Sequence, residues 1–313
     1  MALDEVTRNW SNSINVVTIG KGENAIKIGG ETTLPFLHGE GDIPNRPKIA
    51  LDVFDAVPDR WTDTLVDELS EVIDDPVTWA QAGEEWGVDM IVLHMTAHAR
   101  EDDPASSEEC AELASRVCDA VDLPLAIWGS GEEEADNDMF PVVSQALSGE
   151  QCLFGTVTEE NYRTLTATCI ADGHNIIGES PIDINICKQV NVLVSDMGMP
   201  LDKVVIYPCN GALGYGLEYA YSIMERTRLA ALGGDKMMAM PILAQVGPEV
   251  QRAKEAKATE EEMPQWGPEL ERGIAWESTT AVAYLQSGAD IVTLCHPQAV
   301  QLVDEYIQEM MNG

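Results

Sequence analysis

The sequence between His174 and Pro241 decides the fold. Residues 174–189 read HNIIGESPIDINICKQ, residues 204–226 read VVIYPCNGALGYGLEYAYSIMER, and residues 234–241 read GDKMMAMP. In the first two segments a short apolar run leads through a polar or glycine-rich turn into an amphipathic helical pattern, and in the third a new run begins. Strand–turn–helix units of this kind, when repeated, build a barrel whose functional loops gather at one mouth.

The same rhythm extends over most of the chain. The runs are almost entirely apolar, which indicates strands buried on both faces, as in a parallel sheet. We therefore predict a (β/α)8 TIM barrel. The alternative is a doubly wound open sheet, but no G-x-G-x-x-G sequence follows the first strand to support it. The predicted strands are Ile49–Phe54, Met90–Met95, Leu125–Gly129, Cys152–Val157, Asn175–Gly178, Val204–Tyr207, Ala239–Leu243 and Ile291–Cys295. The clearest predicted helices are Glu108–Ala120, Glu160–Ala171, Asp183–Met197, Glu218–Leu232, Glu271–Gln286 and Gln298–Met311.

Two segments interrupt this rhythm. Asn15–Gly20 and Ala25–Gly30 flank a short polar turn and predict a β-hairpin. We expect residues 1–48 to form a hairpin and loop extension that covers one end of a barrel formed by residues 49–313. The second segment, Gln245–Leu270, follows the seventh strand and should lie on the mouth side. This segment is either a functional insertion or a charged surface loop exposed to solvent.

The charge balance excludes some classes of partner. The chain has 313 residues, with 54 acidic and 18 basic side chains and a net charge of −36. Non-specific binding to nucleic acid or to an anionic membrane requires a basic surface, so neither is expected. Two explanations of the acidity stay open: a surface adapted to high salt, and a specific basic partner.

The seven cysteines show no C-x-x-C spacing, and their number is odd. We expect neither a disulfide framework nor a zinc or iron–sulfur cluster held by this chain alone. Several cysteines lie in apolar runs, where cysteine is usually a small buried hydrophobe.

The first eight residues, MALDEVTR, lack the features of a signal peptide, and no apolar run is long enough to span a membrane. We therefore predict a cytoplasmic protein.

Candidate binding residues cluster after strands five to seven. Asp183 suits a helix N-cap, while Asn185 could donate a hydrogen bond to a ligand amide. The loop Asn210–Gly216 contains Gly211, Gly214 and Gly216, which permit positive φ and close approach to a ligand or partner. It could also cradle a phosphate, although it lacks a Lys-Ser/Thr ending, or be a packing turn. A side chain at Gly214 should either strain a positive φ or intrude on a contact. Gln245 lies just after the predicted strand seven, where it should face the mouth of the barrel.

The histidines give weaker signals. His94 and His98 lie at and beyond the end of strand two, and we favour a polar contact at the mouth for His98 over a metal site. His296 follows strand eight. His174 precedes strand five and should lie at the opposite end of the barrel, as a surface or capping residue. We predict no catalytic residue and no metal ligand in this chain; whether the Asp52 and Asp55 carboxylates act as an acid–base pair cannot be read from the sequence.

Several segments together carry a family resemblance. Taken in order and at this spacing, from Gly29 to the C-terminal helix, they resemble the small subunits of corrinoid iron–sulfur proteins, also called delta subunits of the acetyl-CoA decarbonylase/synthase complex. The segments are Gly29–Gly30, Leu34–Phe36, Glu40–Gly41, Asn45–Pro47, Ser180–Pro181, Asp183–Gln189, Gly211–Glu218, Ser222–Arg226, Gly234–Met237, Trp266–Gly267 and His296–Pro297.

The resemblance implies a barrel that pairs with a large subunit carrying an iron–sulfur cluster and cobalamin. The pair would carry a methyl group on cobalt from a methyl-pterin methyltransferase to acetyl-CoA synthase in the reductive acetyl-CoA (Wood–Ljungdahl) pathway. This chain would cap the shared cobalamin, with no iron–sulfur cluster and no complete active site of its own. The residues expected to face the cofactor are Asp183, Asn185, Asn210, Gly211, Gly214, Gly216 and Gln245.

Two other functions remain as alternatives. The chain could be a stand-alone pterin-dependent methyltransferase, with the pterin bound directly in the mouth. It could also be a structural scaffold subunit of a multienzyme complex.

Overall fold

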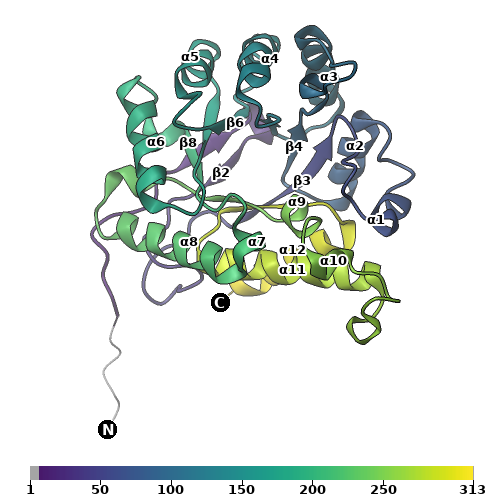
Figure 1. Cartoon of the computed structure of the whole chain (residues 1–313). Coiled ribbons are helices and arrows are strands. Elements are labelled where there is room, and N and C mark those ends of the chain that lie inside the picture. Colours follow the sequence, from purple (N-terminus) through teal and green to yellow (C-terminus); the bar gives the residue numbers. More distant parts are fainter. Residues whose placement is uncertain (1–6, 313) are drawn as a thin grey trace.

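The computed structural model describes residues 7–312 and contains eight parallel strands curved into a nearly closed barrel (Figure 1). The strand order is β8-β7-β6-β5-β4-β3-β10-β9, and a parallel bridge between Ile206 and Ile242 brings the two end strands together. This closure confirms the predicted TIM barrel rather than an open sheet. The barrel strands are β3 (Lys48–Phe54), β4 (Met90–His94), β5 (Leu125–Trp128), β6 (Leu153–Val157), β7 (Asn175–Glu179), β8 (Val204–Tyr207), β9 (Leu243–Gln245) and β10 (Ile291–Leu294).

Helices cover the outside of the barrel. In Figure 1, α3 to α6 lie along one side of the barrel and α8, α11 and α12 along the opposite side. All six helices predicted as clear are confirmed, with ends shifted by at most two residues. The longer helices are α2 (Pro76–Trp86), α3 (Ser107–Ala120), α4 (Glu133–Ala146), α5 (Tyr162–Asp172), α6 (Ile184–Asp196), α8 (Leu217–Leu232), α11 (Glu269–Ser287) and α12 (Pro297–Met311). The short ones are α1 (Asp63–Glu68), α7 (Ala212–Tyr215), α9 (Gly247–Val250) and α10 (Lys254–Lys257). No helix in residues 7–312 combines the length and the apolar character needed to cross a bilayer.

Local capping signals explain where several helices begin. The Ser106 side chain accepts a hydrogen bond from the Glu109 amide, and the Glu109 carboxylate accepts one from the Ser106 amide, which together form a capping box for α3. Asp75 caps α2, whose first residue is Pro76. These residues satisfy amides at the helix start that have no partner inside the helix.

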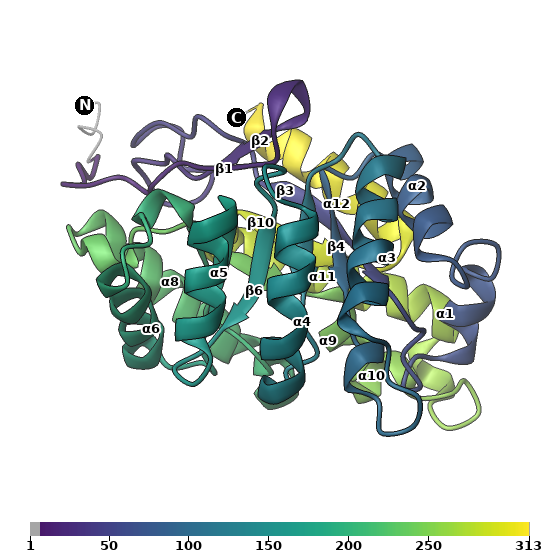
Figure 2. The ribbon, with the colours of Figure 1, turned by 90° about the horizontal axis from the view of Figure 1, so that it is seen from above.

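The predicted hairpin covers the amino ends of the barrel strands. Strands β1 (Val17–Ile19) and β2 (Ile26–Ile28) pair antiparallel. The Gly20 amide donates to the Gln151 carbonyl, and the Asn175 side chain donates to the Thr18 carbonyl. Figure 2 shows the hairpin at one end of the barrel and α9 and α10 at the other. The assignment of residues 1–48 as a separate extension stays a prediction, and residues 1–6, part of the stretch inspected for a signal peptide, lie outside the described residues.

Strand seven of the prediction is wrong in its position. We expected Ala239–Leu243, but β9 spans Leu243–Gln245. Pro241 has no amide hydrogen and so cannot donate to a sheet ladder. Only its carbonyl is used, as acceptor for the Ile206 amide. The apolar run therefore enters the barrel later than its composition suggests.

Buried polar residues fasten the amino end of the barrel. His174 was expected on the surface or as a cap, but its side chain is fully buried. Its Nδ1 accepts from the Cys152 amide at 3.2 Å, and its Nε2 lies 3.0 Å from the Ser144 carbonyl. His174 therefore lies at the amino end of the barrel, as predicted, but it is buried rather than at the surface. Six of the seven cysteines are also buried, as their apolar surroundings predicted.

A buried ion pair joins α8 to Asp290, the residue that directly precedes β10. Arg228 pairs with Asp290, and its Nε donates to the Gly288 carbonyl at 2.9 Å. Asp290 also accepts from the Ile242 amide at 2.6 Å, beside the closing bridge of the barrel. Glu31 lies beside the pair, and its burial, together with the charge of Asp290, raises its pKa to about 8.

The net charge of −36 predicts a salt-dependent stability. Like charges on the folded surface repel one another, and the Debye length falls from about 30 Å at 0.01 M salt to about 3 Å at 1 M. We expect the melting temperature to rise by several degrees between these concentrations, and to rise equally in sodium chloride and choline chloride. A flat profile in scanning calorimetry would show that the acidic residues are compensated locally.

Candidate functional site

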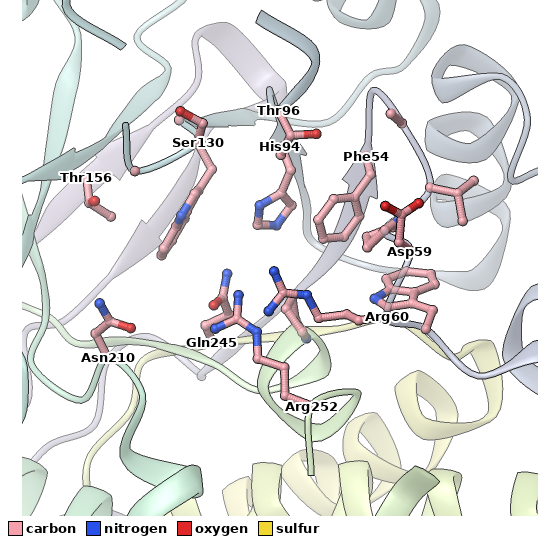
Figure 3. Close-up of a pocket in the computed structure, with 18 of the residues that line it drawn as sticks. Phe54, Asp59, Arg60, His94, Thr96, Ser130, Thr156, Asn210, Gln245 and Arg252 are labelled. Carbon is pink, nitrogen blue, oxygen red and sulfur yellow. The ribbon is translucent and has the colours of Figure 1, made fainter. Parts of the chain in front are cut away.

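A cavity of about 490 Å³ opens at the carboxyl ends of the barrel strands (Figure 3). This is the end where barrels of this type place their functional residues, and the volume lies in the range of small-molecule sites. Seven of the eight strands contribute a residue to its wall, which is the last residue of the strand in six of them and the next to last, Thr156, in β6. These residues are Phe54, His94, Trp128, Thr156, Glu179, Tyr207 and Gln245.

Aromatic rings form one wall of the cavity. The Phe54 and His94 rings stack with centroids 4.2 Å apart and an interplanar angle of 7°. Trp128 lies 5.7 Å from His94 and 5.3 Å from Tyr207, centroid to centroid. Such a wall is suited to a flat conjugated ring or an apolar group.

His94 is fixed from behind by a buried carboxylate. Its Nε2 lies 2.6 Å from Oδ1 of Asp52, whose side chain is fully buried. Burial raises the pKa of Asp52, and the hydrogen bond with His94 opposes that rise. The pair therefore holds the imidazole ring in one orientation, with its face against Phe54.

Glu179 and Asn210 form a polar pair on the opposite side. The Asn210 side-chain amide donates to the Glu179 carboxylate. Burial raises the pKa of Glu179, while hydrogen bonds from Thr156 and Asn210 lower it. Sequence reasoning missed Glu179 because the predicted strand ended at Gly178. The available signal was that Glu179 is the first charged residue after that apolar run.

The glycine-rich loop after β8 is held by a carboxylate of this chain. The Gly211 amide donates to Glu249 Oε1 at 2.6 Å, and the Leu213 amide donates to Oε2 at 3.1 Å. The Tyr207 hydroxyl donates to the same carboxylate at 3.1 Å. These amides already have an anionic partner, so the idea that they cradle a phosphate is wrong for Gly211 and Leu213. Glu249, on α9, was missed because it lies in the insertion and far from the loop in sequence.

Three arginines line the cavity opening, and sequence reasoning missed them too. Arg60 follows β3, Arg100 follows β4 and Arg252 follows α9. Each is exposed, and among residues 7–312 none has a carboxylate within ion-pair distance. Asp59 and Glu179 are the acidic residues of the lining. The lining therefore contains three arginines against two acidic residues, in a chain where acidic residues outnumber basic ones threefold.

The predicted cofactor-facing residues divide into two groups. Asn210 and Gln245 line the cavity, and Gly211 directly follows Asn210. Asp183 is the N-cap of α6, with its Oδ1 accepting from the Asn185 amide at 2.8 Å. Asn185, Gly214 and Gly216 are not among the lining residues. Contact of this second group with a partner-held cofactor stays a prediction.

Two histidines do not reach the cavity. His98 was expected to make a polar contact at the mouth, but it is buried with its Nε2 2.8 Å from Asp136 on α4. That carboxylate also accepts from the amides of Ser130 and Gly131, so it holds the loop after β5. His296 caps α12, its Nδ1 accepting from the Gln298 amide at 3.0 Å. Within residues 7–312, no three His, Cys, Asp or Glu side chains are arranged to hold a metal ion.

Comparison with known proteins places the chain in a family. The family described as CO dehydrogenase/acetyl-CoA synthase delta subunit matches residues 16–301. The chain belongs to this family. Relatives include the acetyl-CoA decarbonylase/synthase complex subunit delta of Methanopyrus kandleri, 34% identical over 297 residues, covering 94% of this chain and 72% of the relative. Subunit delta 1 of Methanosarcina thermophila is 31% identical over 320 residues, covering 97% and 72%.

Solved structures with a similar fold are dihydropteroate synthases. The Xanthomonas albilineans enzyme with 4-aminobenzoic acid superimposes with a TM-score of 0.59 at 12% identity, over 89% of this chain and 97% of that one. The 7,8-dihydropteroate synthase of Vibrio fischeri gives 0.59 at 12% identity, over 87% and 95%. At this identity the likeness shows the barrel fold alone.

Exposed tyrosines lie beside the mouth, on α7 and α8. Tyr215 and Tyr219 are 77% and 51% exposed and pack edge to face with centroids 6.4 Å apart. Tyr221 is 38% exposed. Tyrosine combines a large apolar ring with a polar hydroxyl and is enriched in protein interfaces. We predict an interface with a partner protein at these three tyrosines.

A pair of alanine substitutions separates strain from contact in the glycine-rich loop. Gly211 has φ +69°, whereas Gly214 is not in the left-handed region, and a methyl group at either position meets no atom within 4 Å. Of the two alternatives raised for a side chain at Gly214, strain of a positive φ is therefore excluded, and intrusion on a contact with a ligand or partner stays a prediction. We expect Gly211→Ala to lower the free energy of unfolding by roughly 1–2 kcal/mol. We expect Gly214→Ala to change it by less than about 1 kcal/mol. Urea denaturation measures both, and equal losses would contradict this assignment.

Proposed function

We propose that this chain is the delta subunit of an acetyl-CoA decarbonylase/synthase complex, and that its barrel mouth caps a corrinoid carried by a partner subunit. The observation that carries the proposal is the family match over residues 16–301. The position of the cavity supports it, because the cavity opens at the mouth beside exposed tyrosines. The partner would be the large subunit of the corrinoid iron–sulfur protein.

The residues at the mouth fit the periphery of a corrinoid. Asn210 and Gln245 present amide groups that can pair with the side-chain amides of a corrin ring, and Trp128 and His94 offer ring faces. We infer that Asp183, Asn185, Gly214 and Gly216 contact the corrinoid or its carrier from outside the cavity. When bound, the corrinoid supplies the cobalt centre that carries the methyl group.

The chain itself contributes positioning and exclusion of water. The aromatic wall of Phe54, His94 and Trp128 provides an apolar surface on which a methyl group can lie away from water. The Asp52 carboxylate keeps the His94 ring fixed, and Glu249 keeps the loop after β8 fixed, so the surface is formed before a ligand binds. This division of labour needs no complete catalytic set in the chain.

We further propose that the assembled pair receives its methyl group from a methyl-pterin methyltransferase and delivers it to acetyl-CoA synthase, in the cytoplasm. The direction of this transfer and the pterin used are left open. The acidic surface would then face either concentrated salt or a basic partner in the complex.

A pterin-dependent methyltransferase is the alternative, and one observation favours it. The cavity is large enough for a small ligand, with an aromatic wall on one side and the Glu179–Asn210 pair on the other. A flat heterocycle with several hydrogen-bonding edges could bind there directly.

Co-expression with the corrinoid-carrying subunit tests the proposal. We expect light scattering to show a 1:1 complex with corrinoid absorbance, and the purified chain alone to bind neither corrinoid nor methyl-pterin tightly. Tight binding of methyl-pterin by the chain alone would favour the alternative. Two independent monomers at micromolar concentration would overturn the capping role.

A further inference from the structure

Two arginines at the cavity opening face one another. Arg60 reaches in from the loop after β3, and Arg252 reaches in from the segment after α9. In Figure 3 their guanidinium groups lie side by side, close to Gln245 and on the open side of His94. Arg100 lines the same cavity. The elements that carry these side chains lie far apart in sequence, so the fold brings them together.

Three other arginines of the chain pair with carboxylates. Arg46 lies 2.8 Å from Asp89, Arg116 lies 3.8 Å from Asp75, and Arg228 pairs with Asp290. With 54 acidic side chains in the chain, carboxylates are abundant. Yet Arg60 and Arg252 have none within ion-pair distance anywhere in residues 7–312. Two neighbouring positive charges repel unless an anion lies between them.

Three carboxylates near the mouth accept hydrogen bonds from other groups of the chain, whereas Asp59, the neighbour of Arg60 in the sequence, lines the cavity without forming an ion pair among the described residues. Glu249 accepts from the Gly211 and Leu213 amides, and Asp55 accepts from the Thr96 and Ala97 amides. Glu179 accepts from Asn210. These acids still act on the arginines through their charge, and the charge of Arg252 helps to lower the pKa of Glu249 against the effect of its burial. None of them lies within ion-pair distance of Arg60 or Arg252, so the donor groups of both guanidinium forks are free of carboxylate partners within the described residues.

We propose that Arg60 and Arg252 form a clamp for an oxyanion group, a phosphate or a carboxylate, on a small-molecule ligand whose flat portion lies against the aromatic wall. A guanidinium group presents a planar fork of donors that matches either oxyanion bidentately. The clamp rests on charge and geometry alone, and it holds for both candidate functions.

The two candidate ligands would supply different oxyanions. A corrinoid carries a phosphodiester in its nucleotide arm, whereas a pterin cofactor carries carboxylates on its glutamyl tail. The clamp recognises the chemistry that they share, so the source of the anion has to be found by measurement.

Calorimetric titration of the full chain with inorganic phosphate and, separately, with glutarate at 0.05 M salt tests the clamp. We expect at least one of the two anions to bind, and the Arg60→Gln/Arg252→Gln double variant to bind it about tenfold or more weakly. Arg60→Lys and Arg252→Lys, each made alone, should bind the anion more tightly than the double glutamine variant but more weakly than the unmodified chain, because lysine lacks the planar fork of donors. Preference for phosphate would indicate the phosphodiester, and preference for glutarate the carboxylates.

Arg226→Gln is the matched control, because Arg226 is an exposed arginine on α8 that does not line the cavity. It should bind the anion like the unmodified chain. The clamp variants should keep the melting temperature, since both arginines are exposed and make no ion pair within the described residues. No binding of either anion by the unmodified chain would overturn the proposal. Equal weakening by Arg226→Gln would overturn it as well. Neither result would bear on whether the chain pairs with a corrinoid-carrying subunit.

Discussion

Replacing Arg228 with methionine is expected to lower the free energy of unfolding by about 3–5 kcal/mol, because the buried Asp290 carboxylate would lose its charged partner. Arg228 is 4% exposed and also donates to the Gly288 carbonyl, so its loss leaves several acceptors unsatisfied. Methionine keeps most of the aliphatic volume and isolates the electrostatic contribution.

Urea denaturation at pH 7 measures this loss. Arg226→Met, two residues earlier on the same helix, replaces an exposed side chain and should change stability by less than about 0.5 kcal/mol. Similar small losses in both variants would show that the Arg228–Asp290 pair contributes little to closing the barrel.

Glu277 should make the protein less stable as the pH rises. Its side chain is fully buried on α11, and burial raises its pKa from 4.5 to about 8. A group with a raised pKa contributes stability below its unfolded pKa, and that contribution disappears as the pH approaches the folded pKa. One pKa unit corresponds to 1.36 kcal/mol, so we expect the titration of Glu277 to lower the free energy of unfolding by about 3 kcal/mol between pH 5 and pH 8.

Glu277→Gln removes this titration. Its amide oxygen can still accept from the Cys295 and His296 amides, as the carboxylate does. The variant should lose about 3 kcal/mol less stability than the unmodified chain between pH 5 and pH 8. Other titrating groups, including Glu31, are present in both proteins and cancel in the comparison. Parallel pH profiles in chemical denaturation would contradict a neutral, buried Glu277.

Local patterns were sufficient to predict the fold. Apolar runs separated by helical periodicity gave the barrel, and glycine and polar residues around Lys21–Asn24 gave the hairpin. Asp183 was recognised as a possible helix cap because capping depends on neighbours within three residues. Where a backbone property intervened, as at Pro241, the predicted strand was displaced.

The site was only partly predictable, because its contacts join distant segments. Asn210 and Gln245 could be found, since they follow strand ends. The anchoring of the β8 loop by Glu249 could not be predicted, because Gly211 and Glu249 lie 38 positions apart in the sequence. The arginines at the mouth lie several residues beyond their strands, and nothing local distinguishes them from solvated charges. His98 was misplaced for the same reason, because its partner Asp136 lies on another helix.

The two ends of the barrel carry different tasks. Polar groups at the amino end, such as His174 and Arg228, are buried and engaged in structural contacts. At the mouth, Arg60, Arg252 and Tyr215 are exposed and make no ion pair in the described part of the chain. TIM barrels usually divide their ends in this way, with residues for stability at the amino ends of the strands and residues for function at the carboxyl ends.

Hydrogen–deuterium exchange of the chain, alone and in complex with the corrinoid-carrying subunit, tests the central claim most directly. If the mouth caps the partner's corrinoid, amides in residues 55–61 and 212–221 should become protected in the complex, while the hairpin at residues 17–28 exchanges as before. Protection confined to the hairpin end, with an unchanged mouth, would contradict the account.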